Sequence, residues 1–282
     1  MAARRARPVA RALLALAVLA LPTACSTHHA KGAQPRTAPA LAAAAGYEQT
    51  VLLDGARGLW PLRDADGLRP RDEVAELTAA RRTATVVGGT ITGTTSPGGA
   101  RAALFLRGGR IVTPIASGLT DKDAFTLEMG VRVDACTSAW GRVLGTTALT
   151  DHGREGVEVL HLPSQFRLNP CRLAVEFWHR GKHLGGCHPS TVPAIGRWTH
   201  LAVVYQSRSV VCYEDGVVVA RQALFAPAVF SQPGPLGIGG SGSGFQGPVD
   251  GVSLSEVAVY DHPLTPAQVR AHAALLRKPP KP

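Results

Sequence analysis

The stretch WTHLAVVYQSRSVVCYEDGVVV, residues 198–219, decides the fold of this chain. Its β-branched and aromatic residues predict two strands joined by a short polar link at 206–209, followed by a third strand. Asp215-Gly216 predicts the tight turn before the third strand, because glycine adopts positive φ at little cost.

Strand patterns continue on both sides of this stretch. The clearest lies at 125–133, where every second residue is apolar, which predicts a half-buried strand. We also expect an apolar strand around 51–53, an aromatic strand at 58–62, and a C-terminal helix at 265–276 in which Gln268 completes a capping box. Strand-like runs separated by Gly, Pro and Asp turns favour an all-β sandwich.

Part of the basic charge of the chain lies in a removable leader. Residues 1–24 have the form of an export signal, with a charged region followed by an apolar region too short to span a bilayer. Removing its four arginines from the formal net charge of +10 leaves +6. The other basic residues form no long run, which favours a solvated surface over a nucleic-acid site.

Three further segments follow the leader. Thr23-Ala24-Cys25 resembles the end of a bacterial lipobox, which implies lipidation of Cys25 and a membrane anchor at the outer face of the cell; the alternative is ordinary secretion. Residues 25–46 predict a flexible tether, 47–276 one domain, and 277–282 a disordered basic tail.

Four cysteines remain after Cys25, and an even number in an exported chain implies disulfides with three pairings open. Cys171 and Cys187 flank an expected hairpin, and pairing them would close a loop of about 15 residues, worth about 3 kcal/mol. Cys136 would then pair with Cys212. The alternative for this region is a metal site, whose ligands would be His179, His183, Cys187 and His188.

Five ordered motifs resemble the laminin G-like domains of the concanavalin A-like lectin/glucanase jelly-roll family. They are GLWPL (58–62), AFTLE (124–128), WTHLA with YEDG (198–216), LGIGG with FQG (236–247) and VAVYDHPLT (257–265). The resemblance implies a concanavalin A-like jelly-roll sandwich of two antiparallel sheets with a short C-terminal helix. It leaves function open, because this fold carries lectins, adhesion modules and hydrolases.

The sequence offers little for catalysis. Hydrolases of this fold carry paired glutamates around an aspartate on one strand face. The local pair here, Glu155 and Glu158, is three residues apart, which in a strand directs the side chains to opposite faces. The resemblance places His200 in a core strand, so we expect a packed, hydrogen-bonded side chain and not a base.

Ligand binding is the remaining chemistry, because sugar rings stack on aromatic faces while polar groups hold their hydroxyls. In the strand at 173–178 the apolar residues alternate, so the polar ones share the outward face. The predicted ligand-binding residues are Trp178, Glu176, Arg180 and Arg172, with Trp140 on a loop as a second aromatic. The alternative is that an adjacent loop covers Trp178.

We therefore expect a non-catalytic, exported binding protein that recognises a carbohydrate or cell-wall polymer and does not bind nucleic acid. The alternatives are a divergent glycoside hydrolase or lyase of the same fold, and a protein-adhesion module. The resemblance also implies calcium in a rim loop, for which the candidate donors are Asp121, Asp123, Asp151 and Asp250. The sequence gives neither the ligand nor the oligomeric state.

Overall fold

The computed structural model describes residues 46–63, 84–116, 123–163, 171–188, 194–230, 234–243, 247 and 249–277. All of them lie within the compact unit Ala38–Pro282; the other unit, Met1–Thr37, falls outside the described residues. The predicted export signal, Cys25, the tether up to residue 45, Asp121 and the tail after Arg277 also fall outside them.

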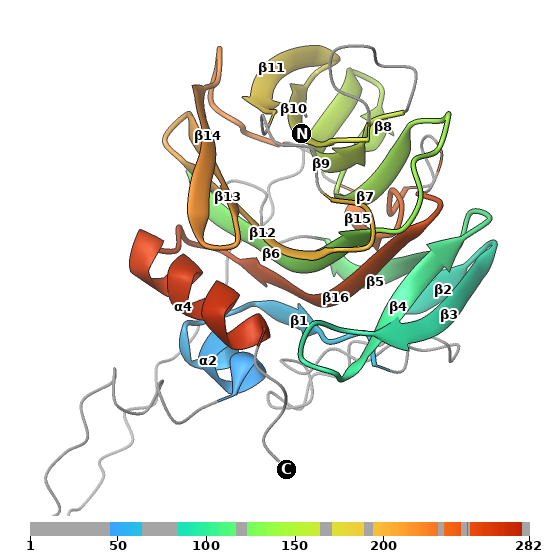
Figure 1. The fold of residues 1–282 in the computed structure, drawn as a ribbon. Helices are drawn as coiled ribbons and strands as arrows, with labels where there is room; N and C mark the ends of the chain where they lie inside the picture. Colours follow the sequence, from blue (N-terminus) through green and yellow to red (C-terminus); the bar gives the residue numbers. More distant parts are fainter. Residues whose placement is uncertain are drawn as a thin grey trace, which may run out of the picture. The chain divides into compact units, whose positions relative to one another are not determined.

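Two antiparallel sheets of eight strands form the sandwich (Figure 1). Sheet A runs in the order β14 (Val217–Ala223), β13 (Ser209–Glu214), β12 (Trp198–Gln206), β6 (Ala124–Val133), β16 (Val252–Tyr260), β4 (Arg101–Leu106) and β3 (Thr90–Thr95), and β1 (Gly58–Trp60) pairs with β16. Sheet B runs in the order β11 (Lys182–Cys187), β10 (Leu173–His179), β9 (Gly153–His161), β7 (Gly141–Gly145), β15 (Pro235–Ile238), β5 (Arg110–Ala116) and β2 (Thr85–Val87), and β8 (Ala148–Thr150) pairs with β9. The all-β sandwich prediction is confirmed.

Turn chemistry sets the register of the stretch that decides the fold. Asp215 and Gly216 both have positive φ, 53° and 80°, as do Ser207 and Arg208 in the preceding link, 46° and 71°. Two-residue turns of this kind match the right-handed twist of paired strands. They therefore join β12, β13 and β14 into consecutive antiparallel hairpins.

The core lies between the two sheets. β6 contributes the alternating apolar residues predicted from the sequence, and β10 contributes Leu173, Val175 and Phe177. Trp60, on β1, is 0% exposed in the same cluster. Because successive residues of a strand face opposite sides, this inward set leaves the intervening side chains of β9 and β10 on the outer face of sheet B.

Two helices cover the outer face of sheet A, as Figure 1 shows: α2 (Tyr47–Leu53) and α4 (Pro266–Leu276). The predicted capping box of α4 is present, with the Thr265 hydroxyl accepting from the backbone of Gln268. A second apolar cluster joins both helices to β12, β13 and β16. The predicted half-buried strand β6 is therefore buried on both faces, down to Glu128 at 0% exposure.

The prediction of a strand around 51–53 was wrong, because these residues end helix α2. The buried positions of α2 are Tyr47, Thr50 and Val51, spaced three and four residues apart as on one helical face. A run of three apolar residues does not distinguish this period from a buried strand.

The predicted pairing of the cysteines was also wrong. The disulfides are Cys136–Cys171 and Cys187–Cys212, with Cα–Cα distances of 5.3 and 6.2 Å. In the β10–β11 hairpin Cys187 is opposite Val175. Cys171 thus lies four residues further along, about 13 Å at the rise of a strand, out of reach of Cys187. With Cys187 oxidised, the alternative metal site loses one of its ligands.

Candidate functional site

A pocket of about 620 Å³ lies on the outer face of sheet B. Strands β7, β9 and β10 form its floor, and the loop before β7 supplies part of its wall. Its lining residues are Trp140, Gly141, Arg142, Arg154, Leu160, Glu176, Trp178 and Gly247. Three of the five predicted ligand-binding residues, Trp178, Glu176 and Trp140, therefore meet in one hollow.

Below the pocket, two guanidinium groups share one carboxylate. Arg142 donates through Nε and Arg154 through Nη2 to the two oxygens of Glu158, which is 0% exposed. The Thr147 hydroxyl donates to the same carboxylate over 3.4 Å. Burial lowers the pKa of Arg142 and of Arg154 to about 10, so both remain charged at neutral pH.

Trp178 is contacted from both neighbouring strands. The Arg154 guanidinium of β9 lies over its ring, with Cζ 4.1 Å from the centroid. The His183 ring of β11 lies 4.9 Å away, centroid to centroid, tilted by 48°. The indole N–H of Trp178 donates to Glu176 over 3.2 Å. These contacts fix the indole and limit the area of its faces that a sugar could stack on.

Trp140 is the more exposed aromatic of the pocket, at 43%. It ends the loop between β6 and β7 and lies beside Gly141 at the pocket wall. The other two predicted residues do not line the pocket. Arg172 precedes β10, and Arg180 occupies the exposed β10–β11 turn with φ of 48°.

Glu158 also lies directly opposite Glu176 in the β9–β10 register. Two carboxylates on adjacent strands are the arrangement that would favour a hydrolase, and the local sequence comparison of Glu155 with Glu158 missed it. Glu155 takes another environment, with its Oε1 3.7 Å from Nδ1 of His179. The sequence analysis also missed Arg142 and Arg154. A signal was present at their partner, because Val157 and Val159 face the core and alternation therefore places Glu158 on the outer face.

A second buried cluster of titratable groups lies on the other side of the sandwich, under α4. Glu128 accepts from Tyr47 over 2.5 Å and lies 3.1 Å from Nε2 of His200 and 2.9 Å from Nδ1 of His272. Burial alone would raise the pKa of Glu128, but the two histidines hold it below its usual range. His200 is 1% exposed, as expected for a packed core residue.

Of the candidate calcium donors, Asp123, Asp151 and Asp250 lie in the part of the chain that the structure describes, and they form no cluster with one another. Asp250 accepts a hydrogen bond from the backbone N–H of Arg107 over 3.1 Å. Over the described ranges, no three His, Cys, Asp or Glu side chains lie close enough to hold a metal ion. Within the same ranges, no helix has the length and apolar character needed to cross a membrane.

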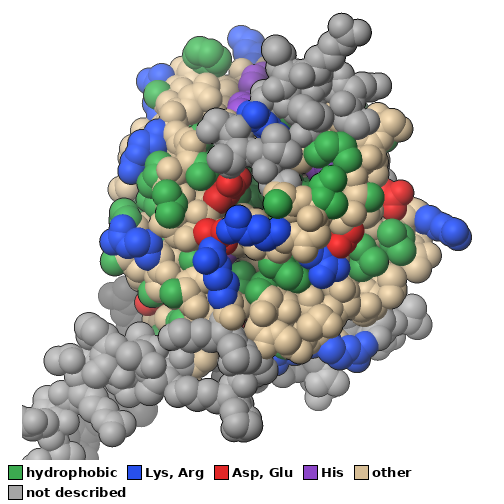
Figure 2. Space-filling model, viewed as in Figure 1, with side chains coloured by type: hydrophobic (Ala, Val, Ile, Leu, Met, Phe, Trp, Pro, Cys, Tyr) green, Lys and Arg blue, Asp and Glu red, His purple; other side chains and the backbone are tan. Residues whose placement is uncertain are grey.

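Figure 2 shows how the basic side chains are distributed over one face of the molecule. On the face shown in Figure 2, Lys and Arg are separated by hydrophobic and uncharged surface or lie beside acidic side chains. Sequence-independent binding of nucleic acid requires a continuous basic area. That the chain does not bind nucleic acid stays a prediction.

The family model described as the concanavalin A-like lectin/glucanases superfamily matches residues 107–270, more than half of the chain. The chain belongs to this superfamily. The matched part of this concanavalin A-like chain includes every lining residue of the pocket. A search of curated proteins found no match. Two disulfides in a member of this superfamily indicate an exported protein.

Solved structures share the concanavalin A-like fold at low identity. Domain 4 of an extracellular arabinanase from Geobacillus stearothermophilus, in complex with arabinotriose, has a TM-score of 0.57 at 19% identity, over 77% of this chain and 98% of that domain. A mutant Trypanosoma rangeli sialidase displaying trans-sialidase activity has a TM-score of 0.58 at 16% identity, over 80% of this chain and 34% of the sialidase. The receptor binding domain of a botulinum neurotoxin C/D mosaic serotype has a TM-score of 0.59 at 6% identity, over 78% of this chain and 51% of that chain.

Proposed function

We propose that this chain is an exported, non-catalytic carbohydrate-binding protein whose saccharide occupies the pocket on the outer face of sheet B. The observation that carries the proposal is the convergence of two tryptophans, two arginines and Glu176 in one hollow. Aromatic area takes the apolar face of a sugar, and a mixture of donors and acceptors suits hydroxyl groups, which both donate and accept.

The charges of the pocket favour a neutral saccharide. Arg142 and Arg154 face the carboxylate of Glu158, and Glu176 adds a second negative charge at the lining. Formal charges therefore cancel in and below the pocket. Glu176 can accept from sugar hydroxyls, and Trp140 offers more exposed ring area than the covered Trp178.

Binding is favoured over hydrolysis by the state of Glu158. Glycoside hydrolysis needs one carboxyl group that is protonated and reaches the glycosidic oxygen. The Glu158 carboxylate is fully buried and accepts hydrogen bonds from two guanidiniums, so its oxygens are already occupied and do not reach a ligand. Glu176 alone would remain for both catalytic tasks.

A direct test measures binding by the purified protein. Arabinotriose, the ligand of the structural neighbour, and a panel of cell-wall polysaccharides would be titrated by calorimetry, with and without calcium. We expect saturable binding that weakens at least tenfold in Trp140→Ala. Phe225→Ala is the matched control, because Phe225 is 77% exposed and does not line the pocket. Equal loss in both variants, or no binding to any saccharide, would reject the proposal in favour of a protein-adhesion module.

A hydrolase remains the second candidate, because Glu158 and Glu176 are cross-strand partners. Release of reducing ends from the same panel would support it. If hydrolytic activity is lost in Glu176→Gln and kept in Trp140→Ala, the hydrolase would replace the binding protein as the proposed function.

The lipid anchor is a separate proposal for Cys25. Cys25→Ala should release the protein from the membrane fraction, and unchanged fractionation would reject the anchor.

A further inference from the structure

We propose that the Cys136–Cys171 disulfide positions Trp140 at the pocket and so sets the affinity of the pocket for its saccharide. The inference rests on the proposed function for the affinity, and on contacts of the described residues for the positioning. It concerns one loop, residues 134–140, which runs from the end of β6 to the start of β7.

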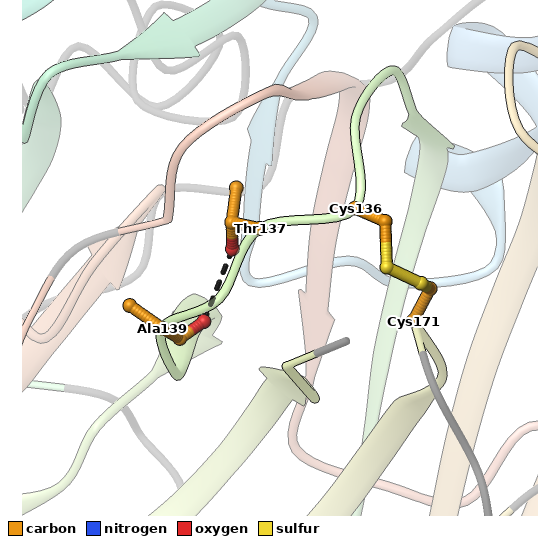
Figure 3. Close-up of a disulfide and its surroundings, with 4 residues drawn as sticks. All are labelled: Cys136, Thr137, Ala139 and Cys171. Carbon is orange, nitrogen blue, oxygen red and sulfur yellow. Dashed lines mark hydrogen bonds between the residues drawn. A yellow bond between two sulfur atoms is a disulfide. The ribbon is translucent and has the colours of Figure 1, made fainter. Parts of the chain in front are cut away.

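The first part of this loop is fixed by three links. The backbone N–H groups of Asp134 and Ala135 donate to the carbonyl of Gly251, over 2.8 and 3.1 Å. The next residue, Cys136, is bonded to Cys171, just before β10 (Figure 3). The disulfide therefore ties the loop to the strand that carries Glu176 and Trp178.

The second part of the loop is linked to its surroundings near β7. The Thr137 hydroxyl donates to the carbonyl of Ala139 over 3.1 Å, within the loop itself (Figure 3). After Trp140, Gly141 lies so close to Val249 that a Cβ would come within 2.8 Å of the Val249 Cα. The backbone N–H of Arg142 then donates to the carbonyl of Gly247 over 3.3 Å. Trp140 is thus held between the disulfide and the first residues of β7.

Most residues of the loop are exposed. Ala135, Ser138, Ala139 and Trp140 are exposed, so little apolar burial holds the segment in one conformation. Without the covalent link, a larger part of the ordering of the loop would have to occur when the saccharide binds. That cost lowers affinity, whereas a pre-ordered loop avoids it.

The second disulfide provides a matched control. Cys187 and Cys212 are 1% and 0% exposed and connect sheet B to sheet A within the core. Neither residue lines the pocket. The sequence separations, 35 and 25 residues, are similar, so the loop-entropy model gives both bonds nearly equal stabilisation.

The affinity test is a double-mutant cycle with arabinotriose as the probe. Cys136→Ser/Cys171→Ser should raise Kd about tenfold, and Cys187→Ser/Cys212→Ser should leave it within twofold. In a Trp140→Ala background, removing Cys136–Cys171 should change Kd less than twofold, because the effect acts through that indole. If the wild type binds arabinotriose and the variant without Cys136–Cys171 binds it with the same Kd, the inference is overturned.

A ligand-independent measurement keeps the inference separable from the proposed function. In protein labelled with 5-fluorotryptophan, the ¹⁹F signal of Trp140 should shift and narrow when Cys136–Cys171 is removed, and stay in place when Cys187–Cys212 is removed. The signal of Trp60, which is 0% exposed, reports an intact core. If the serine variant loses that signal, mild reduction of the more exposed Cys136–Cys171 bond in the native protein gives the same comparison. An unmoved Trp140 signal rejects the positioning role even if no saccharide binds.

Discussion

At Glu158, two guanidinium groups share one buried carboxylate. Ionic groups of this kind gain little when both partners are present but cost much when one is removed, because a buried charge then loses its counter-charge. The energetic importance of Glu158 therefore lies in what it neutralises beneath the pocket, more than in any contact with a ligand.

Replacing Glu158 should destabilise the domain strongly. We expect Glu158→Ala to lower the free energy of unfolding by about 3 kcal/mol, because Arg142 and Arg154 lose the carboxylate that they share. Glu176→Ala is the matched control on the facing strand and should cost less than about 1 kcal/mol, because that carboxylate is only half-buried. Urea denaturation measures both values. Similar costs for the two variants would contradict the assignment of Glu158 as the shared counter-ion.

Helix α4 shows how an element is held by its cap and by one buried histidine. The capping box at Thr265 satisfies backbone groups at the start of the helix. Further along, His272 bonds to Glu128 through Nδ1 and to Asp54 through Nε2, each over 2.9 Å. The imidazole thus connects α4 to strand β6 and to the end of α2.

The cap can be tested without touching the core. Thr265→Ala should lower the free energy of unfolding by about 1 kcal/mol, because the hydroxyl that accepts from the Gln268 backbone is lost. Thr265→Ser keeps the hydroxyl and should restore most of that value. Thermal denaturation of the two variants makes the comparison. Equal melting temperatures for Ala and Ser would show that the cap contributes nothing.

The histidine predicts a pH dependence. Burial disfavours the charged imidazole, but hydrogen bonds to Glu128 and Asp54 raise the pKa of His272 above its ordinary value. A raised folded-state pKa gives stability that is complete below the unfolded value of about 6.5 and is lost as pH rises through the folded value.

Melting temperatures between pH 5 and 9 should therefore fall on the alkaline side, and His272→Gln should flatten that decline. His152→Gln, at an exposed turn, should not. An identical decline in both variants would assign the pH dependence to other groups.

The same cluster explains what the sequence could and could not predict. Glu128, His200 and Tyr260 lie in the motifs through which the sequence resembles the family, and in the structure His200 and Tyr260 both contact Glu128. Helix α2, which closes this cluster, was not predicted. It buries only three residues, and its short apolar run in the sequence resembles a strand.

The candidate site was predictable only in part, for a similar reason. Trp178 and Glu176 lie on one strand, so alternation alone places them together. Arg142 and Arg154 reach the same point from other strands, which only the order of strands in sheet B reveals. Disulfide pairing depends equally on register between elements, and local spacing therefore gave the wrong pairs.

For the whole molecule, the two disulfides join parts of the sandwich that are distant in sequence. Digestion of the unreduced protein followed by mass spectrometry should yield Cys136 linked to Cys171 and Cys187 linked to Cys212, since these pairs have Cα atoms within bonding range. The reduced digest is the control. A peptide pair containing both Cys171 and Cys187 would mean that the β10–β11 register is different.

Helices α2 and α4 contact each other and lie on the outer face of sheet A, whereas the pocket opens from the outer face of sheet B. Tyr47, at the start of α2, and Leu276, at the end of α4, therefore lie on the face of the sandwich opposite the pocket. A bead, sensor chip or reporter coupled to an exposed side chain of either helix should not block access to the pocket. An engineered array of such domains would display the faces that carry the pocket to the medium.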